Sequence, residues 1–305
     1  MLGLSTAWLT EKPKLTGHHI IKEIVSLSFE AVELDYRITE AMFTEMAPLL
    51  VEEKLKVLSI HNFFPLPKGT PRSGAGANEL LLSTPYHEER ARAVEQTVRT
   101  IETAEKLGAL AVVLHLGRVE MDPEYGRLSD LFQHNEQNSP EGQRFRKRKL
   151  KERREKRGRY LENVLRSLDR LSREADKRGV LLGIENRYYY QEIPDFEEIG
   201  QILARFSGGP VSYWHDVGHA HVQERLGFTE PGALLRSYGS MLAGIHIHDA
   251  LGTDDHRAPG TGEIDFLALT GSLRSARIKI LEVHKKSSRQ DLLKGRHMLE
   301  SIGLV

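Results

Sequence analysis

The residues with the clearest chemical potential lie in one stretch, LAGIHIHDALGTDDHRAPGTGEIDF, between Leu242 and Phe266. It begins as an apolar strand that carries His246 and His248, and it continues into a loop rich in Gly and Pro. The loop contains carboxylates, an imidazole and a guanidinium at Asp249, Asp254, Asp255, His256 and Arg257. Imidazoles and carboxylates gathered this densely behind a strand suit a divalent metal ion or a polar, charged substrate.

The composition excludes several kinds of site and partner. Lysine plus arginine and aspartate plus glutamate each number 43, so no net charge attracts nucleic acid or a membrane, and any nucleic-acid affinity would be local. Because the chain has no cysteine, metal ligands must be His, Asp or Glu. The first residues, MLGLSTAWLTEKPK, show no basic leader or apolar signal, and no stretch is long enough to span a bilayer. We therefore expect a cytoplasmic protein without membrane contact.

Short apolar segments alternate with amphipathic segments along the whole chain. The predicted strands are 2–8, 31–35, 56–61, 110–116, 180–186, 211–215, 242–248 and 278–283. Crossover helices make neighbouring strands parallel, and eight such units close into a barrel. The chain has 305 residues, 39% of them hydrophobic, and can bury a large core. The sequence therefore predicts an α/β fold, a single (β/α)8 TIM barrel domain over residues 1–305.

Ligand-capable side chains recur at the ends of six consecutive predicted strands. They are His61, His115, Glu185, Asp216 with His219, His246 with Asp254 and His256 beyond it, and Glu282. In a parallel barrel the reacting groups lie at these carboxyl ends. A single histidine there is usually structural, but Glu185 and Glu282 lie inside apolar strands, where an unpaired carboxylate is costly. Together these strand ends predict one metal or substrate site.

One segment, at about residues 117–160, departs from the alternation of strands and helices. It includes RFRKRKLKERREKRGR, which predicts a long basic helical insertion after the fourth strand. Arg148 with Glu152 and Lys151 with Glu155 have the i, i+4 spacing of an exposed, charge-laced helix. The alternatives are phosphate or nucleic-acid binding, a subunit contact in a homo-oligomer, and a lid over the site.

Five motifs resemble the xylose-isomerase-like barrel superfamily, and the resemblance extends over nearly the whole chain. They are GIENR from residue 183, HDVGHA from residue 215, HIHD from residue 246, DDHRAPGTGEIDF from residue 254 and LEV from residue 281. That superfamily contains sugar and sugar-phosphate isomerases and epimerases, and also the endonuclease IV family. The motifs point to the superfamily more strongly than to any one activity within it.

Similarity to the ketose epimerase branch implies a single divalent ion held by Glu185, Asp216, His246 and Glu282. It also implies that the two glutamates transfer protons, and that His219 and an arginine near Arg257 contact the substrate. His61 and His115 are further candidates for substrate contact. Trp8, at the end of the first predicted strand, is a candidate cover for the substrate, and core filling is the alternative.

The chemistry of these residues agrees with that branch. Carboxylates from two strands on separate sides of a barrel mouth can address opposite faces of a carbon next to a carbonyl. A metal ion on the carbonyl would stabilise the enediolate that forms when a proton leaves. Carboxylates with one imidazole favour Mn²⁺ or Mg²⁺. The expected protein is a metal-dependent isomerase or epimerase that acts on a small-molecule sugar or sugar phosphate.

The alternative is an endonuclease IV-like phosphodiesterase or AP endonuclease with several metal ions, which would favour Zn²⁺. By motif position all nine ligand slots of that family are filled here, by His61, His115, Glu185, Asp216, His219, His246, Asp254, His256 and Glu282. The sequences around the third, sixth and eighth strands differ from that family's signatures. The loop ending in APGTGEIDF follows a pattern common in the isomerase-like branch, so we favour the isomerase or epimerase.

Overall fold

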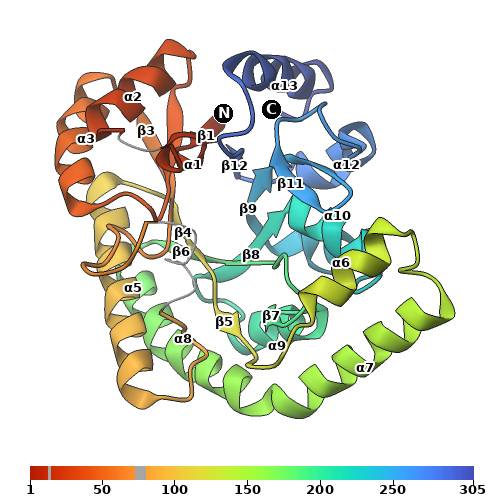
Figure 1. The fold of residues 1–305 in the computed structure, drawn as a ribbon. Coiled ribbons are helices and arrows are strands. Elements are labelled where there is room, and N and C mark those ends of the chain that lie inside the picture. Colours follow the sequence, from red (N-terminus) through yellow and green to blue (C-terminus); the bar gives the residue numbers. More distant parts are fainter. Residues whose placement is uncertain (13–14, 73–79) are drawn as a thin grey trace.

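The computed structural model describes residues 1–12, 15–72 and 80–305, and it contains a closed barrel of parallel strands (Figure 1). The barrel strands are β1 (Leu2–Ser5), β2 (Ala31–Leu34), β3 (Lys56–His61), β4 (Ala111–Leu114), β6 (Leu181–Glu185), β8 (Val211–Asp216), β9 (Leu242–Ile247) and β12 (Ile278–Leu281). They follow one another around the ring in chain order, and β12 closes it by pairing with β1. This topology confirms the predicted TIM barrel.

Helices cover the outside of the barrel (Figure 1). They are α1 (Ala7–Thr10), α2 (Gly17–Ser26), α3 (Glu40–Glu52), α5 (His87–Leu107), α6 (Tyr125–Gln133), α7 (Pro140–Lys156), α8 (Gly158–Arg178), α9 (Phe196–Arg205), α10 (Val217–Arg225), α11 (Ala233–Tyr238), η1 (Gly239–Met241), α12 (Phe266–Leu273) and α13 (Arg289–Ser301). Two small antiparallel sheets lie outside the barrel. They pair β5 (Gly117–Arg118) with β7 (Glu192–Ile193) and β10 (Asp249–Leu251) with β11 (Asp254–Arg257). Among the described helices, none is both long and apolar enough to cross a membrane.

Local sequence explains where several helices begin and end. The side chains of Thr16 and Thr39 each accept a backbone hydrogen bond in the first turn of α2 and α3. A capping box between Asp195 and Glu198 starts α9. Helix α8 ends at Gly179, whose φ of 65° lies in the left-handed region that glycine adopts without a steric cost.

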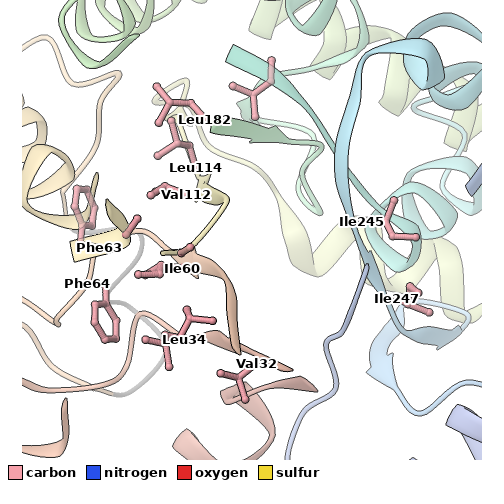
Figure 2. Packing of buried hydrophobic residues seen from close by; sticks show 14 of the residues in the cluster. Val32, Leu34, Ile60, Phe63, Phe64, Val112, Leu114, Leu182, Ile245 and Ile247 are labelled. Atoms are coloured by element: carbon pink, nitrogen blue, oxygen red, sulfur yellow. The ribbon is translucent and has the colours of Figure 1, made fainter. Parts of the chain in front are cut away.

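The outward-facing side chains of the strands pack against the helices and form the largest part of the core. Figure 2 shows some of its members, among them Val32, Ile60, Val112, Leu182 and Ile245. These side chains alternate along each strand with side chains that face the barrel interior. Burial of apolar surface stabilises a fold by about 25 cal/mol per Å², so this layer between strands and helices is the main stabilising feature.

The lower part of the barrel interior is filled by the side chain of Trp214, which is fully buried. Glycines on the two neighbouring strands make room for its ring, because a Cβ added at Gly183 or Gly244 would lie 2.8 or 2.4 Å from Trp214 carbons. Ile278 and Ile280 complete this inner cluster. The barrel is therefore closed beneath its carboxyl-terminal mouth, and the mouth is left for polar residues.

The first predicted strand, 2–8, is longer than the observed one. β1 ends at Ser5, and Trp8 lies in α1, because the carbonyl of Thr6 accepts backbone hydrogen bonds from the following turn. The Pro- and Gly-rich sequence after residue 61 predicts a loop there, and its residues 73–79 lie outside the described residues.

The segment at about 117–160 forms β5, α6, α7 and the start of α8, and α7 runs along the outside of the barrel (Figure 1). Its description as an insertion stays a prediction. The Lys151–Glu155 pair is present at 3.8 Å between two exposed side chains, as the spacing predicted. Lys149 and Arg153, however, are buried, because carbonyls and carboxylates from other elements surround their cationic groups. The expectation of a wholly exposed helix is therefore wrong.

Candidate functional site

A layer of potential ligands lies directly above Trp214, at the carboxyl ends of the strands. Side chains two positions apart in a strand share a face, so each inward-facing residue of the lower layer is followed by a second inward-facing residue. On β8 Trp214 precedes Asp216, and on β9 Gly244 precedes His246, whose ring lies edge-to-face with Trp214 at 5.1 Å. The same spacing relates Val113 to His115, Gly183 to Glu185 and Ile280 to Glu282.

The central group consists of the four residues that the epimerase resemblance implies as metal ligands. Ligand atoms of Glu185, Asp216, His246 and Glu282 all lie within 4.8 Å of one another, and all four side chains are buried. Nδ1 of His246 is 2.6 Å from Oε1 of Glu185 and 2.9 Å from Oε2 of Glu282. It is 3.7 Å from Oδ2 of Asp216. Four different strands thus bring one imidazole nitrogen among three carboxylates.

Glu33 holds the other face of the same imidazole. Its Oε2 lies 3.0 Å from Nε2 of His246 and accepts a hydrogen bond from Ser59 at 2.7 Å. Its Oε1 accepts a hydrogen bond from Ser5 at 3.2 Å. Burial alone would lower the pKa of His246, but the carboxylates of Glu282 and Glu33 raise that pKa well above its ordinary value. The imidazole is therefore protonated when no other cation is present, with Nδ1 directed at the central group.

The carboxylates of the central group are ionised by the same contacts. Burial would raise the pKa of Glu185, but hydrogen bonds from His115 and His246 hold it well below its usual range. Burial likewise opposes ionisation of Glu282, and His246 and His256 lower its pKa nonetheless. Both glutamates can therefore accept a proton at neutral pH.

A second group of potential ligands shares Glu185 with the central group. His61, His115 and Glu185 bring ligand atoms within 4.8 Å of one another. Nε2 of His115 is 2.9 Å from Oε2 of Glu185, and its Nδ1 is buried without a hydrogen-bond partner among the described residues. Burial and the nearby Arg187 guanidinium lower the pKa of His115 well below its ordinary value, so its imidazole is neutral and can donate a lone pair.

A third group shares Asp216 with the central group. It consists of Asp216, His219, His248 and His256, again within 4.8 Å. Nε2 of His248 is 2.9 Å from Oδ1 of Asp216, and the rings of His248 and His256 stack at 4.1 Å. Burial would lower the pKa of His256, but the carboxylate of Asp255 raises it to about 9. Glu185 thus joins the second group to the central group, and Asp216 joins the third group to it.

The structure places Asp254 outside these groups. Its half-exposed carboxylate contacts Lys286 and pairs with Arg257 at 2.8 Å. The backbone of His256 has a φ of 52°, in the left-handed region that residues other than glycine rarely adopt. His248, which the motif comparison did not name, belongs to the third group, whereas Asp254, one of its nine expected ligands, belongs to none of the groups found among the described residues.

The three groups open into a pocket of about 390 Å³ at the mouth of the barrel. Predicted residues that line it are His61, His115, Glu185, His219, Asp254, His256 and Glu282. Arg257 and Trp8 are not among its described lining residues. Arg257 donates to Asp254 and to the carbonyl of Thr261, and Trp8 is buried with its indole N–H 2.8 Å from the carbonyl of Ser287. The surroundings of Trp8 match the core-filling alternative.

Several polar residues of the pocket were not predicted as site residues from sequence. They are Arg37, Arg187, Glu192, Asp255 and His284. Arg187 lies within the GIENR motif, two residues after Glu185, and this spacing was an available signal. His248 had a similar signal, because it follows His246 by two positions on the same strand face. Arg37 and His284 each follow a strand end by three residues, after β2 and β12, so the convergence of strand ends was an available signal for them too.

The donors of the central group fit a divalent cation. Four buried carboxylates, Glu33 included, surround one imidazolium, and buried carboxylates need a cation in direct contact. His246 directs one nitrogen at the group and the other at a carboxylate, which is the usual environment of a metal-bound histidine. Oxygen-rich ligands with one imidazole suit Mn²⁺ or Mg²⁺. The four residues of the central group, Glu185, Asp216, His246 and Glu282, would hold the ion.

Solved structures with this fold include several sugar epimerases. A D-tagatose 3-epimerase-like protein superposes with a TM-score of 0.69 at 18% identity, covering 99% of this chain and 96% of its own. For a 3-keto-D-glucoside 4-epimerase from E. coli the TM-score is 0.68 at 17% identity, with 98% of each chain covered. For an L-ribulose 3-epimerase the TM-score is 0.67 at 16% identity, covering 99% of this chain and 94% of that one. Likeness at this identity demonstrates a shared fold.

Curated proteins contain no significant sequence match to this chain. A family model described as the xylose isomerase-like TIM barrel does match, over residues 21–302. The match spans the barrel from α2 to α13 and includes every residue of the three ligand groups. The chain therefore belongs to the xylose isomerase-like TIM barrel family.

Proposed function

We propose that this protein is a metal-dependent epimerase or isomerase of a small sugar or sugar phosphate. The observation that carries the proposal is the convergence of Glu185 and Glu282 on one nitrogen of His246, at 2.6 and 2.9 Å, on the floor of an open pocket. Epimerisation next to a carbonyl needs proton-transfer groups that reach opposite faces of one carbon, and two carboxyl groups can serve. Strands β6 and β12 supply them from separate positions around the barrel.

In the proposed reaction one glutamate removes a proton from the carbon next to the substrate carbonyl. The other glutamate, after taking up a proton from solvent, delivers it to the opposite face of that carbon, and the first glutamate then releases its proton to solvent. The contacts that lower the pKa of each carboxyl group keep the proton-accepting form available at neutral pH. A divalent ion held by the central group would supply charge stabilisation for the oxygen of the carbonyl.

The remaining pocket residues suit a polyhydroxylated substrate. His219, Asp255 and Arg37 offer donors and acceptors around the mouth, and the rings of Tyr36 and Tyr188 add flat apolar surface. Mixed polar and aromatic walls are what a sugar ring or chain requires. The structural neighbours whose names describe sugar epimerases support this substrate class.

The proposal is tested by incubating the purified protein with Mn²⁺ and a panel of ketoses, aldoses and their phosphates in deuterated water. We expect deuterium to enter the carbon next to the carbonyl, together with formation of an epimer or isomer, and EDTA to abolish both. No exchange into any sugar of the panel would contradict the proposal.

A second candidate is a phosphodiesterase with several metal ions. The observation in its favour is that Glu185 and Asp216 each belong to two ligand groups, because shared carboxylates can bridge neighbouring ions. Metal stoichiometry and cleavage of DNA with an abasic site distinguish the two candidates. One ion per chain without strand cleavage supports the epimerase. Two or three ions with strand cleavage and no exchange into sugars support the phosphodiesterase.

A further inference from the structure

We propose that Arg187 is the positioning residue of Glu185, and that the basic helix α7 holds Arg187 in place through Arg153. This inference rests on the proposed function. It assigns a role to the stretch 144–159, whose charge the proposed reaction does not otherwise use.

The first step is the contact between Arg187 and Glu185. Nη1 of Arg187 donates to Oε2 of Glu185, and both side chains are buried. The same Oε2 is 2.9 Å from His115, whereas Oε1 is 2.6 Å from His246. Arg187 thus engages one carboxylate oxygen from the side and leaves the other directed at the central group. Because the N–H groups of a guanidinium have a rigid planar geometry, the direction of the Nη1 contact with Glu185 is set by whatever holds the rest of the group.

The second step is the support of Arg187 by Glu192 in β7. Nη2 of Arg187 donates to Oε1 of Glu192 at 3.2 Å. The other oxygen of Glu192 accepts the backbone N–H of Tyr189 at 3.0 Å. Because both oxygens of this buried carboxylate are occupied, Glu192 holds the far end of the guanidinium in one orientation.

The third step connects β7 to the basic helix. Nη2 of Arg153 donates to the backbone carbonyl of Glu192 at 2.7 Å. The same guanidinium makes a paired contact with both oxygens of Glu198, at 3.0 and 2.7 Å, and also contacts Asp195. Arg153 is only 2% exposed and Glu198 is fully buried. A chain of buried contacts therefore runs from α7 through Arg153, Glu192 and Arg187 to Glu185.

This support acts on only one of the two glutamates. The ion pairs of Glu282 in the described part of the chain are with His246 and His256, and none involves an arginine. Disturbing the contact chain should therefore impair proton transfer on the face that Glu185 serves and spare the face that Glu282 serves. A general loss of structure cannot produce this asymmetry.

The test uses substitutions that keep the charge, Arg187→Lys and Arg153→Lys, with Arg154→Lys as the matched control. Arg154 lies on the same helix, is 71% exposed and, within the described part of the chain, pairs only with exposed Glu197. Lysine retains the positive charge but cannot reproduce the planar, paired contact. Each variant is assayed in deuterated water with both members of the epimer pair that the wild-type protein interconverts fastest, starting with D-fructose and D-psicose.

From the epimer whose proton Glu185 removes, we expect exchange and inversion both to fall about 10–100-fold in Arg187→Lys, the range typical for residues that orient a ligand. From the other epimer, whose proton Glu282 removes, deuterium exchange should persist. Conversion to the first epimer should fall, because Glu185 must deliver the proton on the opposite face. Arg153→Lys should show the same asymmetry to a smaller degree, and Arg154→Lys should match the wild type. Because both epimers are assayed on one sample, partial unfolding lowers both rates equally and leaves their ratio unchanged.

A readout independent of turnover is the dissociation constant of Mn²⁺ by titration calorimetry. It should rise in Arg187→Lys and stay unchanged in Arg154→Lys, because a misoriented Glu185 binds an ion less well. The positioning role is overturned if Arg187→Lys lowers deuterium exchange equally from both epimers. It is also overturned if the ratio of the two exchange rates and the affinity for Mn²⁺ both stay unchanged in this variant. If the wild-type protein itself exchanges no sugar, the proposed function fails. In that case, unchanged Mn²⁺ affinity in Arg187→Lys would overturn the positioning role as well.

Discussion

Oε2 of Glu33 and Nε2 of His246 lie 3.0 Å apart in the closed interior of the barrel, and neither side chain is exposed. Glu33 thereby selects the nitrogen with which His246 faces the central group. This contact joins β2 to β9, on separate parts of the ring, and it is the basis of the first prediction.

The substitution Glu33→Gln should weaken binding of Mn²⁺ by about 10–100-fold, because the carboxylate behind a metal-bound histidine fixes its orientation and raises its basicity. Titration calorimetry measures the change. Glu30→Gln is the control, because Glu30 lies three residues before Glu33 and is exposed. An unchanged dissociation constant in Glu33→Gln would show that His246 does not bind the ion or is oriented in another way.

The substitution Glu282→Gln distinguishes the two candidate reactions. In an epimerase it should retain some bound metal yet lower turnover by about 10²–10⁴-fold, the usual contribution of general acid–base catalysis. In a phosphodiesterase the loss should follow metal occupancy and be partly restored by excess metal. Steady-state rates measured over a range of Mn²⁺ concentrations separate the two outcomes, and recovery at high metal would count against the epimerase.

Gly244→Ala tests the packing beneath the site. The new Cβ would lie 2.4 Å from the ring of Trp214, so we expect the free energy of unfolding to fall by about 1–3 kcal/mol through overpacking. Adding Trp214→Phe should recover part of that loss, because the smaller ring leaves room for the methyl group. Gly271→Ala, at a helical position with open space around it, is the control and should not destabilise. Urea unfolding at neutral pH measures all four proteins.

The buried pair of Arg153 and Glu198 predicts a pH-dependent stability defect. Burial raises the pKa of Glu198 even though Arg153 opposes the shift. In Arg153→Met the carboxylate loses its nearest cationic partner, with Nη1 of Arg157 left at 3.9 Å, and its pKa in the folded state rises further above the unfolded value. The folded variant then binds a proton more tightly than the unfolded chain, so its stability is lost as pH rises through that pKa.

We therefore expect Arg153→Met to cost about 3–5 kcal/mol at pH 8, the usual cost of leaving one buried charge unpaired, and less at pH 5. Urea unfolding at both pH values measures the difference from the wild type. The double variant Arg153→Met/Glu198→Gln should show a smaller defect with little pH dependence. A defect of equal size at pH 5 and pH 8 in the single variant would mean that Glu198 is not the group responsible.

Much of the fold follows from local pattern. Apolar segments such as 56–61 and 278–283 are short and bounded by turns, and their alternation with amphipathic helices leaves a parallel barrel as the consistent topology. The barrel in turn brings strand ends together. For this reason Glu185, Asp216, His246 and Glu282, far apart in the chain, could be predicted from sequence as neighbours before any contact was known.

Other features depend on contacts that no local pattern contains. That His248 joins the third ligand group and Asp254 does not depends on their partners, because His248 contacts Asp216 whereas Asp254 pairs with Arg257 and Lys286. Whether the charge of Arg153 is solvated depends on Glu198, 45 residues away, because a cation is buried only where a distant element supplies its partner. The ligands at the strand ends could be predicted from the sequence, since strand period and parallel pairing are local rules. Which charges those ligands meet is known only from the folded chain, since it depends on side chains from elements that the closed barrel brings together.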